Sequence, residues 1–447
     1  MESMRKIVAN IGFFLQITGL LLVLPIVIGL QSGELQAVAS LVTTSFIAFG
    51  AGFAFNCFAE RKELDERTSL WLLLFTFTVL PLVLMIPYIW NNVFNIPNPL
   101  DLFTNSYFET VSGFTTTGFS FVPHPESLPL SLLFFRSLVE FIGGVGFIYV
   151  LVAFLYPKED LDAFSETFGI EKISDNLKGL FVSILLVYTF FVSVFTAIFY
   201  FTYPPPNLVV ASCTAIDVLT GGYQPNITAG IGVFQISILV LMLLGSLNFN
   251  FHYKIFHLKR HDLLTPEIKL FLIIIAASTV IISILAWMNP FDSLFHVVSM
   301  ASSTGIEYIS IAATPISAKI LFIIIGLIGG CAFSMAGGIK IRRIQQLIAA
   351  ARKSEDEPTR EELKSITAFI ISFIAILLII SFAFSTIGIS LLDSIFEVGS
   401  ALTTNGISMG ITTITMPIGY KWLLIAAMII GRVEILNILK AIRGPSS

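Results

Sequence analysis

The amino-acid sequence predicts an all-α polytopic membrane protein. It has four helix–pore loop–helix repeats around a pseudo-fourfold pore, plus two N-terminal transmembrane helices. Two observations predict this fold class. First, 55% of the 447 residues are apolar and only 12% are charged, a composition far from that of soluble globular proteins. Second, short Thr/Ser-rich turns interrupt the apolar chain four times, and they contain Gly118, Gly222, Gly305 and Gly406.

Ten apolar segments are long enough to cross a bilayer, because a helix needs about 20 residues to span a hydrocarbon core about 30 Å thick. They lie near residues 8–30, 35–57, 69–95, 127–156, 177–203, 229–255, 267–289, 317–349, 361–387 and 418–442. The first follows Arg5 and Lys6 and lacks a small-residue cleavage site, so we interpret it as a retained span and not as a signal peptide. A soluble protein with buried helices is the disfavoured alternative.

The spans and turns divide the chain into five predicted units. Residues 1–60 form an N-terminal two-helix unit, residues 69–157 form repeat 1, and residues 177–256 form repeat 2. Residues 266–350 form repeat 3, which also holds a glycine-rich gate, and residues 361–443 form repeat 4. Each repeat contains one pore loop. Three cysteines without a pairing pattern argue against a disulfide scaffold.

Basic residues indicate the orientation, because loops rich in Lys and Arg stay in the cytoplasm. If the ten spans alternate and the glycine turns lie on the other side, these residues share one side. They are Arg5, Lys6, Arg61, Lys62, Arg67, Lys158, Lys172, Lys178, Lys254, Lys259, Arg260, Lys269, Arg342, Arg343, Arg352, Lys353, Arg360, Lys364, Lys440 and Arg443. The sequence therefore predicts a multi-pass protein of the cell membrane with cytoplasmic termini and glycine turns facing outside.

The four turns share residue types at fixed distances from their glycines. Two places before the glycine the chain has a hydroxyl: Thr116, Thr220, Ser303 and Thr404. Ten and six places before it, three copies have Phe and Ser: Phe108 and Ser112, Phe295 and Ser299, and Phe396 and Ser400. The second copy departs, with Ser212 and Ile216 there. Four unrelated extracellular loops are the alternative, but they would not share such offsets.

These turns have the chemistry of a selectivity filter. Irregular backbone at membrane depth must be buried in protein or line water, and stacked backbone carbonyls can replace the hydration shell of a monovalent cation. Glycine supplies the positive φ that aligns successive carbonyls. The predicted filter residues are Thr116, Thr117, Gly118, Thr220, Gly221, Gly222, Ser303, Thr304, Gly305, Thr404, Asn405 and Gly406.

Acidic residues beside the turns have two interpretations, because a charge at membrane depth indicates a functional role by default. Glu307, just after the third turn, could attract cations at the mouth. Glu109 and Glu397, nine places before their glycines, could instead accept hydrogen bonds from filter backbone from behind, which we favour. Arg136 and Glu140 lie four residues apart on one helical face, which predicts a local pair.

A glycine-rich segment, residues 329–338, interrupts the eighth span. Its glycines favour an unwound stretch whose carbonyls lack helical partners. Arg432 in the last span cannot pair with Glu434, because two residues are about 200° apart around a helix. Arg432 beside these carbonyls is either a removable plug beneath the filter or a structural anchor. The predicted gate residues are Gly329, Gly330, Ser334, Gly337, Gly338, Lys340 and Arg432.

Across essentially its whole length the sequence resembles the TrkH and KtrB branch of the potassium transporter superfamily. The matching motifs are Thr115-Thr116-Thr117-Gly118, Arg136-Ser137 with Ile142-Gly143-Gly144-Val145-Gly146, Gly338-Ile339-Lys340, and Gly431-Arg432-Val433-Glu434. The two extra N-terminal spans are closer to the TrkH plan. The resemblance implies potassium uptake, K+ at the filter residues, a homodimer, and an intramembrane gate near Arg432. It also implies cytoplasmic nucleotide-binding regulatory subunits of the TrkA kind.

Three functions are compatible with such a chain to different degrees. The sequence favours a gated, channel-like K+ uptake protein driven by the membrane potential. A Na+- or H+-coupled K+ symporter is the alternative, although carriers usually pair broken helices in two related halves. An enzyme is not expected, because the sequence offers no nucleophile with a neighbouring base within the membrane. No cofactor is expected, since the chain has no phosphate loop or glycine fingerprint with which to bind a nucleotide. No nucleic-acid partner is expected either.

Overall fold

The computed structural model describes residues 2–58, 66–122, 124–150, 177–204, 206–223, 231–256, 263–353 and 358–434. Parts of the predicted units therefore lie outside the described residues, namely residues 1, 59–60, 123, 151–157, 205, 224–230 and 435–443. Several basic residues used for the orientation also lie outside them: Arg61, Lys62, Lys158, Lys172, Lys259, Arg260, Lys440 and Arg443.

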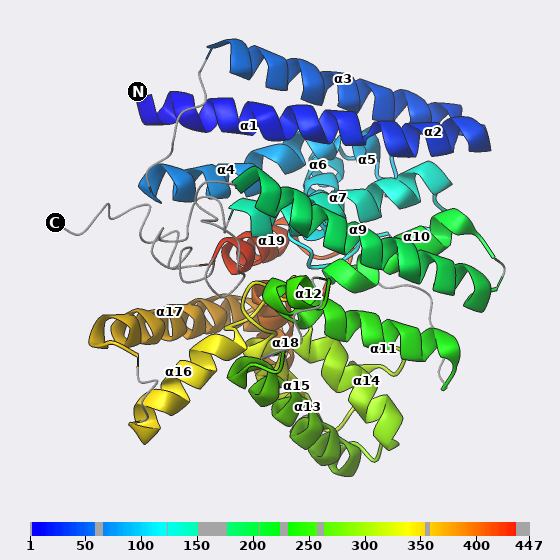
Figure 1. Cartoon of the computed structure of the whole chain (residues 1–447). Helices are drawn as coiled ribbons and strands as arrows, with labels where there is room; N and C mark the ends of the chain where they lie inside the picture. Colours follow the sequence, from blue (N-terminus) through cyan, green and yellow to red (C-terminus); the bar gives the residue numbers. More distant parts are fainter. Residues whose placement is uncertain are drawn as a thin grey trace.

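The described residues fold into helices joined by turns, which confirms the predicted all-α class (Figure 1). The N-terminal unit contains α1 (Glu2–Leu21), α2 (Val23–Ser32) and α3 (Leu35–Phe58). Repeat 1 contains α4 (Glu66–Leu84), α5 (Ile86–Trp90), α6 (Pro99–Phe114) and α7 (Leu130–Val150). Repeat 2 contains α9 (Leu177–Thr202), α10 (Leu208–Thr220), α11 (Val233–Ser246) and α12 (Phe249–Phe256).

The other two repeats follow the same plan. Repeat 3 contains α13 (Pro266–Leu285), α14 (Pro290–Ala301), α15 (Ile316–Ile328) and α16 (Ile341–Arg352). Repeat 4 contains α17 (Arg360–Ser385), α18 (Leu391–Leu402) and α19 (Ile418–Val433). In each repeat a long helix is followed by a short pore helix and then by a second helix. The pore helices are α6, α10, α14 and α18.

Seven helices or helix pairs among the described residues are long and apolar enough to cross a membrane. The other predicted spans are interrupted or short. The span predicted at 229–255 is two helices, α11 and α12, bent by 106°. The span predicted at 317–349 is divided into α15 and α16, and the last span is described as the 16 residues of α19. The bend within 229–255 was not predicted, whereas the interruption of 317–349 at residues 329–338 was predicted and is confirmed.

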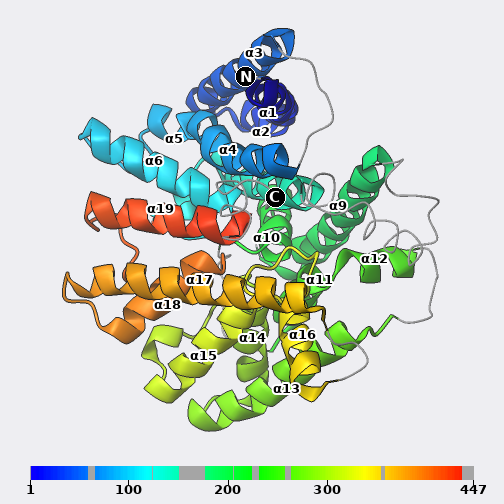
Figure 2. The same cartoon turned by 90° about the vertical axis from the view of Figure 1, so that its left-hand side faces the viewer.

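Small residues let the N-terminal helices pack closely. A Cβ atom added to Gly52 on α3 would lie 2.4 Å from the carbonyl oxygen of Gly12 on α1, and one added to Gly12 would lie 2.8 Å from that of Gly52. Such close backbone approach is typical of membrane helix pairs. α1 packs on α4, and α2 packs on α7, so this unit joins repeat 1. Figures 1 and 2 show α1 to α3 along one edge and α13 to α16 at the opposite edge.

The four repeats pack in a closed cycle. The second helix of each repeat contacts the pore helix of the next: α7 with α10, α11 with α14, α15 with α18, and α19 with α6. Each pore helix also packs against the second helix of its own repeat: α6 with α7, α10 with α11, α14 with α15, and α18 with α19. This closed cycle is the arrangement that the predicted pseudo-fourfold axis requires.

Candidate ion pathway

The four pore helices begin with a side-chain cap and end at the glycine turns. The caps are Asn98, Asn207, Asn289 and Ser390, each accepting a backbone N–H of the first turn. Such caps satisfy amide groups that otherwise have no partner at a helix start. The C-terminal end of a helix carries partial negative charge, which is favourable for a cation. Four such ends therefore meet at the four glycine turns.

The first, third and fourth turns have the same backbone conformation. Positive φ occurs two places before and at each glycine: Thr116 (58°) and Gly118 (83°), Ser303 (55°) and Gly305 (69°), and Thr404 (50°) and Gly406 (81°). The N–H of the residue between them donates to a serine carbonyl: Thr117 to Ser112 (2.8 Å), Thr304 to Ser299 (3.1 Å) and Asn405 to Ser400 (2.8 Å). The serines six places before the glycines thus share one structural role, through their backbone.

The second turn differs. Its positive φ (80°) is at Gly221 and not at Gly222, and the N–H of Gly221 donates to the carbonyl of Asp217 at 3.0 Å. The expectation that Gly222 supplies the positive φ was therefore wrong. Gly222 is required for space instead, because a Cβ atom there would lie 1.0 Å from Oε1 of Glu140.

The turns approach one another closely around one axis. A Cβ atom added to each positive-φ glycine would collide with the next turn: Gly118 with the Gly222 oxygen (2.2 Å), Gly221 with the Ser303 oxygen (2.6 Å), Gly305 with the Asn405 oxygen (1.6 Å) and Gly406 with the Thr117 oxygen (1.9 Å). The contacts run from turn 1 to 2, 2 to 3, 3 to 4 and 4 to 1. All twelve predicted filter residues are brought together in this ring.

Side chains of three pore helices hold the backbone that follows their turns. At the position nine before the glycine, three pore helices present an acceptor to a backbone N–H after the turn: Glu109 to Phe121 (2.9 Å), His296 to Ile309 (3.2 Å) and Glu397 to Met409 (2.7 Å). Glu109 and Glu397 therefore have the interpretation we favoured, as supports behind the filter. Glu307 accepts the N–H of Ile311 at 3.0 Å.

The predicted local pair of Arg136 and Glu140 is wrong. Arg136 donates through Nη2 to Oε1 of Glu109 on α6 at 2.8 Å, and its guanidinium lies 3.8 Å from the centre of the Tyr223 ring. The side chains of Arg136 and Glu109 are almost fully buried, with exposed fractions of 2% and 0%. The pair therefore joins α7 to the first pore helix and to the second turn.

Three glycines on the second helices also belong to the site, although the sequence analysis did not predict them there. A Cβ atom would collide with the end of the pore helix at Gly143 (1.9 Å from the Phe114 oxygen), Gly245 (2.4 Å from the Leu219 oxygen) and Gly431 (2.1 Å from the Leu402 oxygen). These glycines set how closely three of the four second helices, α7, α11 and α19, approach the predicted filter turns. The motifs that contain Gly143 and Gly431 were the sequence signal that could have found two of them.

The glycine-rich segment lies directly beneath the turns. α15 ends at Ile328 and α16 begins at Ile341, so the backbone is unwound over residues 329–340. The N–H of Gly337 donates to Oγ of Ser303 at 3.1 Å, and a Cβ atom on Gly337 would lie 2.0 Å from the carbonyl oxygen of Thr403. Predicted gate and predicted filter residues are therefore in contact.

Repeat 2 and α13 hold this segment from the other side. The N–H groups of Cys331 and Met335 donate to the carbonyls of Ser246 and Gly245, both at 3.1 Å. The N–H of Ala332 donates to Oε1 of Glu267 at 2.6 Å. Within the segment, Ser334 donates to the Cys331 carbonyl and Lys340 to the Ala336 carbonyl. Positive φ at Gly329 and Gly338 allows the reversals.

Arg432 contacts the glycine-rich segment, as its position suggested. Its Nη1 donates to the Met335 carbonyl at 3.1 Å, and its guanidinium lies 4.3 Å from the centre of the Phe147 ring. Glu434 has a different partner, because Nη2 of Arg343 at the start of α16 lies 2.5 Å from its Oε2. The contact is the one that either a plug or an anchor would make.

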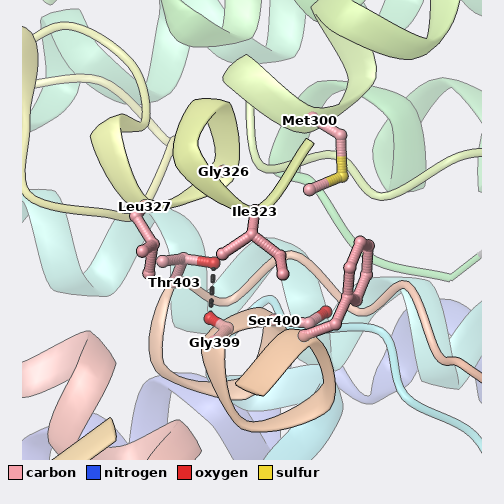
Figure 3. A pocket seen from close by; sticks show the side chains of 8 residues that line it. Met300, Ile323, Gly326, Leu327, Gly399, Ser400 and Thr403 are labelled. Carbon is pink, nitrogen blue, oxygen red and sulfur yellow. Dashed lines mark hydrogen bonds between the residues drawn. The ribbon is translucent and has the colours of Figure 1, made fainter. Parts of the chain in front are cut away.

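A small pocket lies beside the axis, between repeats 3 and 4 (Figure 3). Its lining is mainly apolar, with the Thr403 hydroxyl donating to the Gly399 carbonyl at 2.8 Å. The lining residues are Met300, Ile323, Gly326, Leu327, Phe396, Gly399, Ser400 and Thr403. It lacks the convergent oxygens of an ion site. Among the described residues, no group of three His, Cys, Asp or Glu side chains is placed to hold a metal.

Residues 263–446 match the TrkH family model, described as a cation transport protein. An uncharacterised cation transporter of Methanocaldococcus jannaschii, MJ1485, is 28% identical over 98% of this chain and 95% of its own. The chain thus carries a TrkH family domain over residues 263–446 and is similar to potassium uptake proteins named TrkH along most of its length. Its relatives include the Trk system potassium uptake protein TrkH of Salmonella typhimurium, 25% identical over 85% of this chain and 86% of that one. The family model and these relatives are named as transport proteins and not as enzymes.

The fold agrees with a solved TrkH-family structure. The potassium transporter TrkH from Vibrio parahaemolyticus superposes with a TM-score of 0.82 over 98% of both chains, at 21% identity. This likeness concerns the fold and confirms the predicted helical, multi-pass plan. Together with the apolar helices, it makes the chain a membrane-embedded protein.

Removing Arg136 is expected to destabilise the protein strongly. Arg136→Ala leaves the Glu109 carboxylate buried without its ion pair, and breaking a buried pair in this way costs about 3–5 kcal/mol. The thermal unfolding temperature of the purified protein should fall accordingly. In the double variant Arg136→Ala/Glu109→Gln the buried charge is gone, so much of the stability should return. A double variant as unstable as the single one would contradict this role for the pair.

Proposed function

We propose that this protein takes up potassium across the cell membrane through a gated, channel-like pore with a backbone-carbonyl filter, driven by the membrane potential. The observation that carries the proposal is the closed ring of close approaches among the four turns. A ring of backbone at the ends of four pore helices offers oxygens from every side to one dehydrated cation. Side chains are expected to contribute less than the backbone to binding the cation, because the four turns differ in sequence.

Potassium is the proposed ion because curated relatives along most of this chain are named potassium uptake proteins. The membrane potential supplies about 2.3 kcal/mol per charge for each 100 mV. At 150 mV this supports an inward gradient of about 300-fold, so uptake needs no ATP site on this chain. No resident cofactor is proposed, and K+ is the cargo.

We place the glycine-rich segment at the cytoplasmic end of the pore. α16 follows this segment and carries Arg342, Arg343 and Arg352, and Lys353 caps it, which suits a cytoplasmic position. The filter mouth then faces outside and both termini are cytoplasmic. By resemblance to the family, we also propose a homodimer and regulatory subunits of the TrkA type on the cytoplasmic face.

Proteoliposomes that contain only this protein test the proposal. Under an imposed inside-negative potential, without a Na+ or pH gradient, 86Rb+ should enter, and external K+ should compete better than Na+ or Li+. The matched control is the same vesicles without the potential, in which uptake should be small. Uptake that begins only when Na+ or a pH gradient is supplied would contradict the channel-like mechanism and support the coupled symporter.

A further inference from the structure

One carboxylate of repeat 3 is bonded to the glycine-rich segment and has no part in the transport scheme above. Glu267 lies in the first turn of α13, and its exposed fraction is 9%. Its Oε1 accepts the N–H of Ala332 at 2.6 Å. Ala332 lies in the unwound stretch between α15 and α16. A carboxylate is a stronger acceptor for a backbone N–H than a neutral carbonyl, so this contact is a strong one.

The bond lies where the segment is seated on repeat 2. The N–H groups of Cys331 and Met335 bond to carbonyls at the end of α11, and Ala332 lies between these two residues in the sequence. Oε2 of Glu267 is 3.5 Å from Nδ2 of Asn248, at the break between α11 and α12. Glu267 therefore contacts both the segment and the break on which the segment rests.

The seated segment lies across the way out of the proposed filter. The N–H of Gly337 donates to the Ser303 hydroxyl, and a Cβ atom on Gly337 would collide with the Thr403 carbonyl. An ion that leaves the four turns towards the cytoplasm can pass only when this backbone moves aside. That movement withdraws the N–H of Ala332 from Glu267, and a buried N–H without an acceptor costs free energy.

We propose that Glu267 is a positioning residue that latches the glycine-rich segment in its closed place through the N–H of Ala332. The proposal rests on the function proposed above, in which this segment is the gate. Arg432 holds the segment from α19 through the Met335 carbonyl, whereas Glu267 holds it from α13 through a different group. The segment is thus fastened from two repeats by two independent side chains.

Cys331 provides a reporter for the latch, because it directly precedes Ala332 and is fully buried. A thiol reagent reaches it when the segment opens, so its labelling rate follows the population of the open segment. The rate is measured on the folded, full-length protein with N-ethylmaleimide and peptide mass spectrometry. Glu267→Ala should raise the rate at Cys331 at least about tenfold, since one hydrogen bond to a charged group is lost.

Cys213 is the internal control for unfolding. It is buried on α10, away from the glycine-rich segment. Opening of the segment exposes Cys331 alone, whereas unfolding exposes both thiols. A rise at Cys331 without a rise at Cys213 therefore identifies the latch.

Three further variants separate the latch from other effects of the carboxylate. Glu267→Asp keeps a negative charge at the start of α13, but its shorter side chain does not reach Ala332, so the rate at Cys331 should rise as in Glu267→Ala. Glu267→Gln keeps an acceptor oxygen, and the rate should rise less. The matched control is Glu362→Ala. Glu362 also lies in the first turn of a long helix, α17, where it accepts the N–H of Thr359, and its loss should leave the rate at wild type.

Unchanged labelling of Cys331 in the folded Glu267→Ala and Glu267→Asp proteins would overturn the proposal. Equal rises for Glu267→Ala and Glu267→Gln would contradict the acceptor role, and equal rises at Cys331 and Cys213 would show that Glu267 supports folding instead. If Glu267→Ala does not fold, Glu267→Asp and Glu267→Gln carry the same comparison. Labelling involves no transport, so a wild-type protein without 86Rb+ uptake would contradict the proposed pore and not the latch.

Discussion

Gly305→Ala is expected to abolish potassium-selective uptake. The new Cβ atom would lie 1.6 Å from the carbonyl oxygen of Asn405 in the fourth turn, and this oxygen is fixed backbone that cannot move aside without displacing the ring. Alanine would also be strained at a φ of 69°, at a cost of about 1–2 kcal/mol. Selective 86Rb+ uptake should fall at least about tenfold, which corresponds to only 1.4 kcal/mol of ion stabilisation.

Gly388→Ala is the control that tests backbone strain at positive φ without a steric collision. Gly388 lies between α17 and α18, has a φ of 87° and has open space where its Cβ atom would stand. This variant should therefore lose some stability and keep selective uptake. Gly406→Ala, whose Cβ atom would lie 1.9 Å from the Thr117 oxygen, should behave as Gly305→Ala does. Wild-type selectivity in folded Gly305→Ala protein would contradict the filter assignment.

Arg432→Ala is expected to raise basal uptake. Arg432 holds the glycine-rich segment through the Met335 carbonyl beneath the filter, and a hydrogen bond from a charged group contributes about 1.5–3 kcal/mol. If this bond stabilises the closed segment, its loss shifts the equilibrium towards the open state by about 10- to 150-fold. Potential-driven 86Rb+ uptake without regulatory subunits should increase, by an amount that the open-state flux limits.

Lys421→Ala is the matched control, because Lys421 is also a buried cation on α19. Its Nζ donates to Oδ1 of Asn105 and to the Ile414 carbonyl, both at 2.7 Å, away from the glycine-rich segment. Basal uptake should not rise in this variant. A folded Arg432→Ala protein with unchanged uptake would contradict the plug, and loss of folded Arg432→Ala protein on size exclusion would support the structural anchor.

The sequence predicted the helices and the turns because both depend on local pattern. Apolar runs of sufficient length marked the long helices, and shared offsets from the glycines marked four copies of one design. The serines six places before three glycines illustrate this, since their carbonyls make the same bond in each copy. The second copy, which lacks that serine, is also the one whose turn has a different φ pattern.

Tertiary contacts explain what the sequence could not predict. The spacing of Arg136 and Glu140 suggested a pair, but a carboxylate on another helix, Glu109, offers a better position. The bend between α11 and α12 falls at Leu247 and Asn248, directly after Gly245 and Ser246 at the end of α11. Contacts distant in sequence also hold it: the Phe333 carbonyl accepts the N–H of Phe249 at 3.0 Å. Locally, Asn248 accepts the N–H of Phe251 at 2.9 Å.

The most direct test of the central claim is to locate the ion. Crystals of the wild-type protein grown with Rb+ in place of K+ would be measured at the rubidium absorption edge. We expect anomalous density on the axis between the four turns, within coordination distance of backbone oxygens from all of them, and its loss when Na+ replaces Rb+. Density confined to acidic side chains, or no density on the axis in well-ordered crystals, would contradict the carbonyl filter.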